Sequence, residues 1–488
     1  MSALLLAACS HDARPANVLL ITLDTTRADA LGCYGHPGSP TPNLDAIAAE
    51  GTRFDRAIAT SSLTPVSHAS ILTGLDNAHH GVRVLCAPSG CRLAPSVPTL
   101  GSILKEHGWA TIAVQSAFPV SSWFGLDHGF ERCDDLDGGF VEGTGGKMAW
   151  DQASLQRRAD ETTDRALANL SHATGPFCLW VHYWDPHDGA PEPPDDFVAS
   201  DATVHASDDG RRTRETYEQR VRYVDRQIGR LVAALRARGS WDDTIVVVVA
   251  DHGEGLGDHD WNGHRILYQE QIRVPLLVRV PPRLRERAPV AAYDRVVRTT
   301  DVLPTILDFA GVACASPVDG LSLRAPIEGR SESPRVAFAD EVNGYDLNFA
   351  ALAERPHDDF GYAVIDYPWK YVFRPLHAAN SELFDLSQDA GEAHNVAALE
   401  PERVHKLLRE LARHGGFVTR PFSDDGGSRI ETAAAARALD TLGYVQGREV
   451  GHDARWSWQC PDHPNRLLED HGPCPACGSP CVPVARAR

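Results

Sequence analysis

Three apolar runs in the first half of the chain each end at an aspartate. They are residues 17–23 (NVLLITL, before Asp24), residues 177–184 (FCLWVHYW, before Asp185) and residues 244–250 (TIVVVVA, before Asp251). Because these runs are unbroken by polar alternation, they predict parallel strands that are buried on both faces of a sheet.

Helical patterns lie between these runs. Residues 42–50 form a short helical segment that stops before Gly51, and residues 213–238 carry apolar side chains at helical spacing up to Gly239. Strands that alternate with helices predict an α/β fold with a doubly wound sheet. Since such sheets bind ligands beyond the carboxyl ends of their strands, we expect the three aspartates at one ligand-binding edge.

The pattern changes after about residue 330. Short alternating runs such as YAVIDY and KYVF, with a helical pattern near residues 401–414, predict a smaller α+β domain. We therefore expect a signal segment at 1–9, a catalytic domain at 16–332, the smaller domain at 333–420, a Gly/Ala/Asp-rich linker at 421–455 and a small module at 456–485.

The composition is that of a globular protein and narrows the classes of partner. Of the 488 residues, 43% are hydrophobic and 23% are charged. The 47 basic and 66 acidic residues give a net charge of −19, so we expect no nucleic-acid-binding surface. No apolar run reaches the roughly 18 residues that a membrane-spanning helix needs.

The first residues, MSALLLAACS, resemble a bacterial lipoprotein signal in which Cys9 is lipidated. The resemblance implies a protein of the cell envelope or periplasm, attached to the membrane through Cys9 alone. The segment departs from the pattern because its apolar stretch is short and no Lys or Arg precedes it, so a chance match is the alternative. In an oxidising compartment Cys86 and Cys91 could form a local disulfide; two unpaired thiols are the alternative.

The C-terminal segment WQCPDHPNRLLEDHGPCPACGSPC has the spacing of a metal site. Cys460 and His463 form a C-x2-H pair, and Cys474 and Cys477 form a C-x2-C pair, which together suit tetrahedral zinc. So small a module needs a metal to fold. The segment resembles a small, zinc-ribbon-like heavy-metal-binding domain, although Asp462 and Ser479 replace that family's methionines. Their absence favours structural zinc over copper, with Cys481 as a spare ligand.

A helix start with a hydroxyl side chain lies at Thr64-Pro65, in the segment TSSLTPVSHASILTG. Threonine as the N-cap and proline as the first helical residue predict a capped helix that ends at Gly74. The hydroxyl would also lie in the positive field of the helix N-terminus, which suits a phosphate or sulfate ester.

Ordered matches across some 380 residues resemble the sulfatase family of the alkaline phosphatase superfamily. They are residues 17–35, 64–74, 250–264, 273–279, 300–312, 319–323 and 382–396. The resemblance implies that family's α/β fold with a mixed sheet. It also implies a nucleophile at the head of a helix, beside a metal that is bound at the strand ends.

The resemblance implies that Thr64 occupies the nucleophile position of the family motif C/S-x-P-S-R, with His68 in place of the arginine. Oxidation of Cys or Ser at this position gives an aldehyde, whereas threonine could give only a ketone, so that conversion is not expected. A threonine alkoxide instead favours in-line attack on phosphorus, as in the nucleotide pyrophosphatase/phosphodiesterase branch of the superfamily. Asp24-Thr25, which replaces the paired aspartates of sulfatases, agrees with this interpretation.

We expect two divalent metals, with zinc or manganese favoured over calcium because His252 supplies a nitrogen ligand. The expected ligands are Asp24, Thr64, Asp251 and His252 at the first site, and Asp185, His187 and His264 at the second. Substrate contact is the alternative for His187, and a solvated loop is the alternative for His264.

The leading hypothesis is a metal-dependent hydrolase of phosphate mono- or diesters, with Thr64 as nucleophile and His68 assisting the leaving group. The substrate would be a small anionic ester or a sugar- or lipid-linked one. The alternatives are a sulfuric ester hydrolase, a transferase of phospho-head groups and a catalytically silent metal-binding protein of the envelope.

Overall fold

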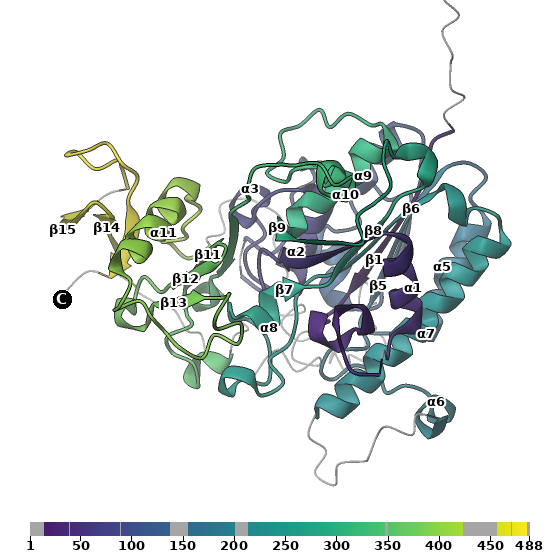
Figure 1. Cartoon of the computed structure of the whole chain (residues 1–488), viewed down its shortest axis with the longest axis horizontal. Coiled ribbons are helices and arrows are strands. Elements are labelled where there is room, and N and C mark those ends of the chain that lie inside the picture. The colour runs from purple at the N-terminus through teal and green to yellow at the C-terminus, as the bar shows by residue number, and fades with distance from the viewer. Residues whose placement is uncertain are drawn as a thin grey trace, which may run out of the picture.

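The computed structural model describes residues 14–38, 40–87, 89–136, 155–200, 213–346, 350–422, 456–469 and 471–485. The described residues form one large sheet with helices on both faces, a smaller sheet beside it and a third, small sheet near the C-terminus (Figure 1). Among the described helices, none is both long enough and apolar enough to cross a membrane.

The large sheet is mixed and has the strand order β4-β3-β5-β1-β6-β8-β2-β7, with β9 paired to β2. Its strands are β1 (Asn17–Leu23), β2 (Thr52–Ile58), β3 (Ala110–Val114), β4 (Arg132–Asp134), β5 (Phe177–Tyr183), β6 (Thr244–Ala250), β7 (Arg273–Val274), β8 (Leu276–Arg279) and β9 (Ala292–Arg298). β1 pairs in parallel with both β5 and β6, whereas β8 runs antiparallel to β6 and β2. The predicted mixed α/β sheet is therefore confirmed.

The three predicted strands form the centre of this sheet. Every residue of β5 and β6 is buried, as are all residues of β1 after Asn17. The unbroken apolar runs arise because helices cover both faces of these strands.

Two groups of helices supply this cover (Figure 1). The first group, whose members pack on one another, is α1 (Pro42–Glu50), α5 (Ala159–Ser171) and α7 (Arg214–Ala237). The second is α2 (Thr64–Thr73), α4 (Leu100–Glu106) and α9 (Val302–Ala310). The remaining helices are the short α3 (Asn77–His80), α6 (Asp195–Ser200), α8 (Gln269–Ile272) and α10 (Arg324–Ile327), together with α11 (Pro401–His414).

The smaller sheet is antiparallel and follows the chain order. Its strands are β10 (Ala337–Glu341), β11 (Gly361–Asp366), β12 (Trp369–Phe373) and β13 (Glu382–Asp385). α11 packs on β11 and β12, while β10 lies against the large sheet, where the Asp340 backbone N–H donates to the Thr60 carbonyl at 2.9 Å. The predicted smaller α+β subdomain is confirmed.

The third sheet consists of β14 (Trp456–Cys460), β15 (His463–Leu468) and β16 (Val482–Ala485), with β14 in the middle. It packs on the smaller subdomain, because the Trp456 indole N–H donates to the Tyr345 hydroxyl at 3.2 Å and the Ala485 N–H donates to the Pro375 carbonyl at 3.2 Å. The expected signal segment with Cys9 and all but the first two residues of the expected linker lie outside the described residues.

Candidate active site

Two aspartates meet where the central strands of the large sheet end. Asp24 follows β1 and Asp251 follows β6, and the parallel register pairs Leu23 with Ala250 just before them. The Asp24 backbone N–H donates to the Tyr183 carbonyl at 2.9 Å, so β5 ends at the same edge. The carboxylate oxygens of Asp24 and Asp251 and a ring nitrogen of His252 lie within 4.8 Å of one another, and all three residues are fully buried.

Thr64 begins helix α2 and faces this group. Leu63 is the N-cap, so Thr64 is the first helical residue and Pro65 the second. The helix therefore begins one residue earlier than predicted. Proline is accommodated in the first helical turn, where its missing N–H is not needed. The Ser67 hydroxyl donates to the Asp251 carbonyl at 2.6 Å, which ties the helix to the end of β6.

The Thr64 hydroxyl contacts the ring of His252, with 3.2 Å between Oγ1 and Nε2. The His252 Nδ1 lies 2.9 Å from the Gly253 carbonyl, which can only accept, so Nδ1 carries the proton and Nε2 does not. Burial, with the neighbouring His264 as a second cause, lowers the pKa of His252. The neutral ring therefore directs an unprotonated nitrogen at the hydroxyl, as a metal ligand requires.

Asp251 offers a carboxylate oxygen that suits a bound cation. Its Oδ1 accepts hydrogen bonds from the backbone N–H groups of Thr25 (3.1 Å) and His252 (2.7 Å). Its Oδ2 is buried and accepts no hydrogen bond among the described residues, and burial raises the pKa of the carboxyl. A divalent cation would compensate the buried Oδ2 atom, which accepts no hydrogen bond from a described residue, so the residues present fit a metal.

His182 supports Asp24 from within β5. Its Nε2 lies 3.2 Å from Asp24 Oδ2, and its Nδ1 lies 2.9 Å from the Ser116 hydroxyl. Because the carboxylate accepts, Nε2 donates and Nδ1 accepts from Ser116. The sequence does not reveal this support, because the partners lie on three different strands or loops.

His68 lies one helical turn after Thr64 and is fully buried. Its Nδ1 donates to the Thr64 carbonyl at 2.8 Å, and its ring packs on those of His182 and Trp180, with centroids at 5.0 and 5.9 Å. Burial lowers the pKa of His68 to about 4, so the ring is neutral. Its expected assistance to the leaving group stays a prediction.

The structure does not form the expected second metal site as a three-ligand group. Asp185 Oδ1 accepts the N–H of Ala159, the first residue of α5, at 3.0 Å, so this aspartate caps a helix. His187 stacks on Trp184 at 3.7 Å between ring centroids. His264 lies beside His252 at 4.6 Å and His187 at 5.5 Å. Within the described ranges, Asp185, His187 and His264 do not come together as a ligand set.

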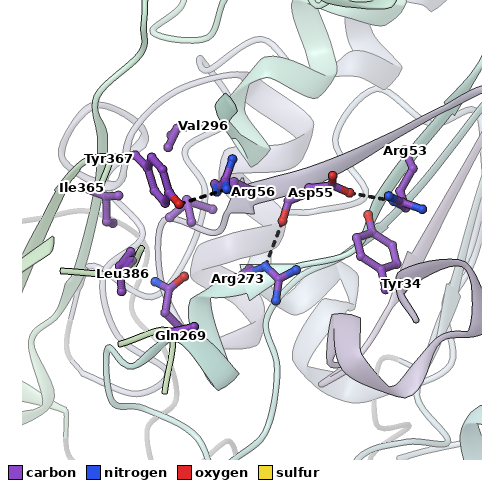
Figure 2. Close-up of a pocket in the computed structure, with 12 residues that line it drawn as sticks. Tyr34, Arg53, Asp55, Arg56, Gln269, Arg273, Val296, Ile365, Tyr367 and Leu386 are labelled. Atoms are coloured by element: carbon purple, nitrogen blue, oxygen red, sulfur yellow. Dashed lines mark hydrogen bonds and ion pairs between the residues drawn. The ribbon is translucent and has the colours of Figure 1, made fainter. Parts of the chain in front are cut away.

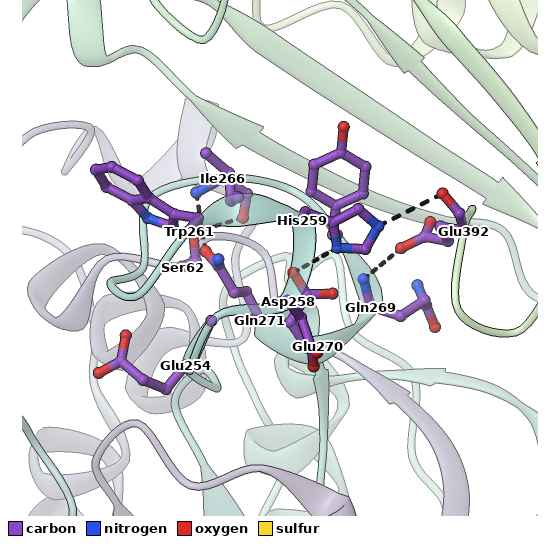
Figure 3. A network of polar contacts seen from close by, with 12 residues as sticks. Ser62, Glu254, Asp258, His259, Trp261, Ile266, Gln269, Glu270, Gln271 and Glu392 are labelled. Carbon is purple, nitrogen blue, oxygen red and sulfur yellow. Dashed lines mark hydrogen bonds and ion pairs between the residues drawn. The ribbon is translucent and has the colours of Figure 1, made fainter. Parts of the chain in front are cut away.

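A tight loop after β6 carries His264 to the site, and its polar network is drawn in Figure 3. The Trp261 indole N–H donates to the His264 carbonyl at 2.8 Å, and His264 Nδ1 donates to the Ser62 carbonyl at 2.8 Å. His259 stacks on Tyr268 and bonds Glu270 at 3.1 Å. The loop is thus held by specific contacts, and His264 is buried rather than solvated.

The C-terminal module brings its four predicted ligands together. Cys460 Sγ lies 3.6 Å from His463 Nδ1 and 3.7 Å from Cys477 Sγ, and Cys474 Sγ lies 3.5 Å from the same His463 nitrogen. These ligand atoms all fall within 4.8 Å of one another, so the group could hold one metal ion. Cys481 lies outside the group, with its thiol directed at the Ser479 carbonyl.

The possible disulfide between Cys86 and Cys91 is not formed, and both side chains are buried. The loop is closed without it, because the N–H groups of Arg83 and Val84 both donate to the Gly90 carbonyl, at 2.6 and 3.2 Å. The Cys91 thiol donates to the Ala87 carbonyl at 3.4 Å instead of bonding Cys86.

A buried hydroxyl and a carboxylate-histidine cluster at the edge of an α/β sheet define a metal-dependent ester hydrolase. The family model described as Sulfatase matches residues 16–312, and that of the N-sulphoglucosamine sulphohydrolase C-terminal region matches residues 257–414. The chain therefore belongs to the sulfatase family of the alkaline phosphatase superfamily. Members of this family use a divalent metal at the active site, and Asp24, Asp251 and His252 are the residues that could hold it.

The chain is similar in sequence to sulfatases, and it shares its fold with a phosphonate monoester hydrolase. The chain is 26% identical to an arylsulfatase of Clostridium perfringens, over 81% of this chain and 94% of that protein. It is also 26% identical to an N-acetylglucosamine-6-O-sulfatase of Bacteroides thetaiotaomicron, over 84% and 88%. The solved phosphonate monoester hydrolase of Agrobacterium radiobacter superposes with a TM-score of 0.63 at 23% identity, covering 82% of this chain and 96% of that one.

Proposed function

We propose that this enzyme cleaves phosphate esters with Thr64 as its nucleophile. Its class, a hydrolase of sulfate or phosphate esters, follows from the family. The choice of phosphate rests on one observation, that a threonine hydroxyl, 3.2 Å from His252 Nε2, faces the Asp24–Asp251–His252 group.

The chemistry of threonine supports this choice. An aldehyde formed at this position would add water, and its hydrate could expel sulfate by re-forming the carbonyl. Threonine carries a methyl group on the same carbon, so this route is closed to it. A threonine oxygen can instead attack phosphorus in line, displace the alcohol oxygen and form a phosphothreonine that water later hydrolyses.

The described residues supply the remaining requirements. A divalent cation held by Asp24, Asp251 and His252 would lower the pKa of the hydroxyl and offset charge on the ester. The histidine ligand favours zinc or manganese over calcium. Thr64 lies at the positive end of α2, which favours an anionic group beside it.

The test uses p-nitrophenyl phosphate, bis-p-nitrophenyl phosphate and p-nitrophenyl sulfate with the full chain loaded with zinc or manganese. Thr64→Val, which keeps the shape but removes the hydroxyl, should lower phosphoester turnover by about 10³-fold or more, whereas Thr64→Ser should retain most of it. Mass spectrometry of acid-quenched wild type should detect a phosphoryl group on Thr64. Phosphoester turnover that survives in Thr64→Val would overturn the proposal.

Sulfate-ester hydrolysis is the second candidate, because the relatives named above include an arylsulfatase and a sugar 6-O-sulfatase. Under it, p-nitrophenyl sulfate would be the preferred substrate and its turnover would persist in Thr64→Val. The similarity to the sugar 6-O-sulfatase favours a sugar-linked anionic ester as the natural substrate.

A further inference from the structure

A cavity of about 400 Å³ lies between the large sheet and the smaller one (Figure 2). Its lining comes from β2, β7 and β9 on one side and from the end of β11 and the following turn on the other. None of the expected catalytic or metal-binding residues lines it. The volume falls in the usual range for small-molecule sites, so the cavity is large enough to hold a ring-sized ligand.

One wall of this cavity is cationic. Arg53 and Arg56 of β2 and Arg273 of β7 all line it, with Asp55 between them. Between Arg53 and Ala57, β2 has one residue more than its antiparallel partners, since Arg53 pairs with Leu277 of β8 and Ala57 pairs with Val274 of β7. A bulge of this kind changes the direction of a side chain, which explains how the successive residues Asp55 and Arg56 both line one cavity.

Two of the three arginines keep an uncompensated charge. Asp55 pairs with Arg53 at 2.7 Å, which neutralises that side chain. Arg273 Nε donates only to the Asp55 backbone carbonyl, at 2.9 Å. Arg56 bonds the Tyr367 hydroxyl at 3.0 Å. In the described part of the chain no carboxylate forms an ion pair with Arg56 or Arg273, although the whole chain carries a net charge of −19.

The rest of the lining forms an apolar and aromatic wall, to which both sides of the cavity contribute: Ile58 of β2, Val296 of β9, Ile365 and Leu386. The Tyr367 ring lies 3.9 Å from the Arg56 guanidinium. An apolar surface beside two guanidinium groups that form no ion pair with a described carboxylate matches a ligand with a hydrophobic body and an anionic end. Arginine is the side chain best suited to such an end, because its planar fork can hold two oxygens of one oxyanion.

We propose that this cavity binds a small organic anion, with a phosphate, sulfate or carboxylate group between Arg56 and Arg273 and a ring against the apolar wall. The anion comes either from a separate small molecule or from a second charged group on an extended substrate. The proposal does not depend on the phosphoester chemistry of Thr64, since it concerns other residues.

Calorimetric titration with phenylphosphonate tests it, using the full chain with its metals. Phenylphosphonate also resembles an ester substrate, so competitive inhibition of p-nitrophenyl phosphate hydrolysis reports its binding at the catalytic centre separately. Arg56→Gln and Arg273→Gln should each weaken the non-inhibitory binding by about tenfold or more and leave the inhibition unchanged. Arg295→Gln is the matched control, because this exposed arginine of β9 lies outside the cavity.

Leu386→Trp fills the cavity without removing a charge and should abolish the same binding, which guards against a folding defect in the arginine variants. Titration with a disulfated disaccharide and its monosulfated counterpart identifies the source of the anion. A preference for the disulfated sugar that Arg56→Gln removes indicates an extended substrate, and equal affinities indicate a separate molecule. Phenylphosphonate binding that is confined to the catalytic centre, or unchanged in both arginine variants, would overturn the proposal.

Discussion

Two ligand clusters in this chain are assembled by opposite means. Asp24, Asp251 and His252 meet because β1 and β6 are neighbours in the large sheet, and the Thr25 N–H reaches the Asp251 carboxylate across 226 residues of sequence. The four ligands of the C-terminal module all lie within residues 460–477. The first cluster is therefore a product of the tertiary fold, whereas the second is a product of local spacing.

Their surroundings differ as much as their assembly. The first cluster is fully buried and ordered by backbone hydrogen bonds, while the second rests on a small core of Trp458, Cys460, Cys474 and Cys481 and leaves Cys477 exposed. At the first cluster a metal would relieve buried charge in an already folded domain. At the second cluster it would supply the free energy of folding itself.

Cys474→Ser should produce the largest effect. Structural zinc in small modules supplies about 10–16 kcal/mol, so loss of one ligand should release the metal and expose residues 456–485 to protease. Ester hydrolysis should stay unchanged. Metal analysis and limited proteolysis measure this, with Cys481→Ser as the matched control. Equal metal loss in both variants would show that Cys481 is a ligand.

Asp251→Asn should lower ester hydrolysis by about 10³-fold while the protein stays folded, because the amide keeps the Oδ1 hydrogen bonds but not the charge. Turnover and active-site metal content measure the loss. Asp185→Asn is the matched control, because Asp185 is equally buried but caps α5. This variant should retain the metal and lose only thermal stability. Loss of the active-site metal from Asp185→Asn would restore Asp185 as a ligand.

His182→Phe should weaken active-site metal binding by about 10- to 100-fold, because phenylalanine has no N–H to donate to the Asp24 carboxylate. His182→Gln should recover part of this affinity, because its amide N–H can replace the Nε2–H donor. Competition with a chelator measures both variants. Identical affinity in wild type and His182→Phe would mean that Asp24 needs no support.

Acid should destabilise the catalytic domain through His80. Burial lowers the pKa of this histidine from 6.5 to about 3, and its Nε2 lies 2.9 Å from the Ser70 hydroxyl. Because the pKa is lowered in the folded state, the free energy of unfolding keeps its full value above pH 6.5 and falls as the pH drops toward 3. At pH 5 the loss is about 2 kcal/mol. Urea unfolding at pH 7 and pH 5 measures this loss. The free energy of unfolding should change less between the two pH values in His80→Gln than in the wild type. Parallel curves would exclude His80 as the group responsible.

Strand-end residues and local spacings were open to prediction from the sequence. Asp24 and Asp251 follow unbroken apolar runs, which places them at one edge of a sheet once helices are seen between the runs. Thr64 was found from its proline and its family motif, with an error of one position in the cap. The module's ligands were found because their spacing alone brings them together.

Long-range side-chain partners were not open to prediction. Asp185 also follows an apolar run, yet its carboxylate turns to the N-terminus of α5, a partner that no local pattern reveals. The support that His182 gives to Asp24 depends on which strand lies beside β5. The arginine-lined cavity depends on a bulge in β2 and on the packing of a second sheet.

The position of β1 in the middle of the large sheet has a consequence for synthesis on the ribosome. β1 emerges first, but both of its neighbours, β5 and β6, come from much later in the chain. At typical elongation rates of about 5–20 residues per second, roughly 10 to 45 seconds separate Asp24 from Asp251. β1 exposes two unpaired, apolar edges until β5 is made and one such edge until β6 is made, so the nascent chain needs shielding long before its catalytic centre can exist.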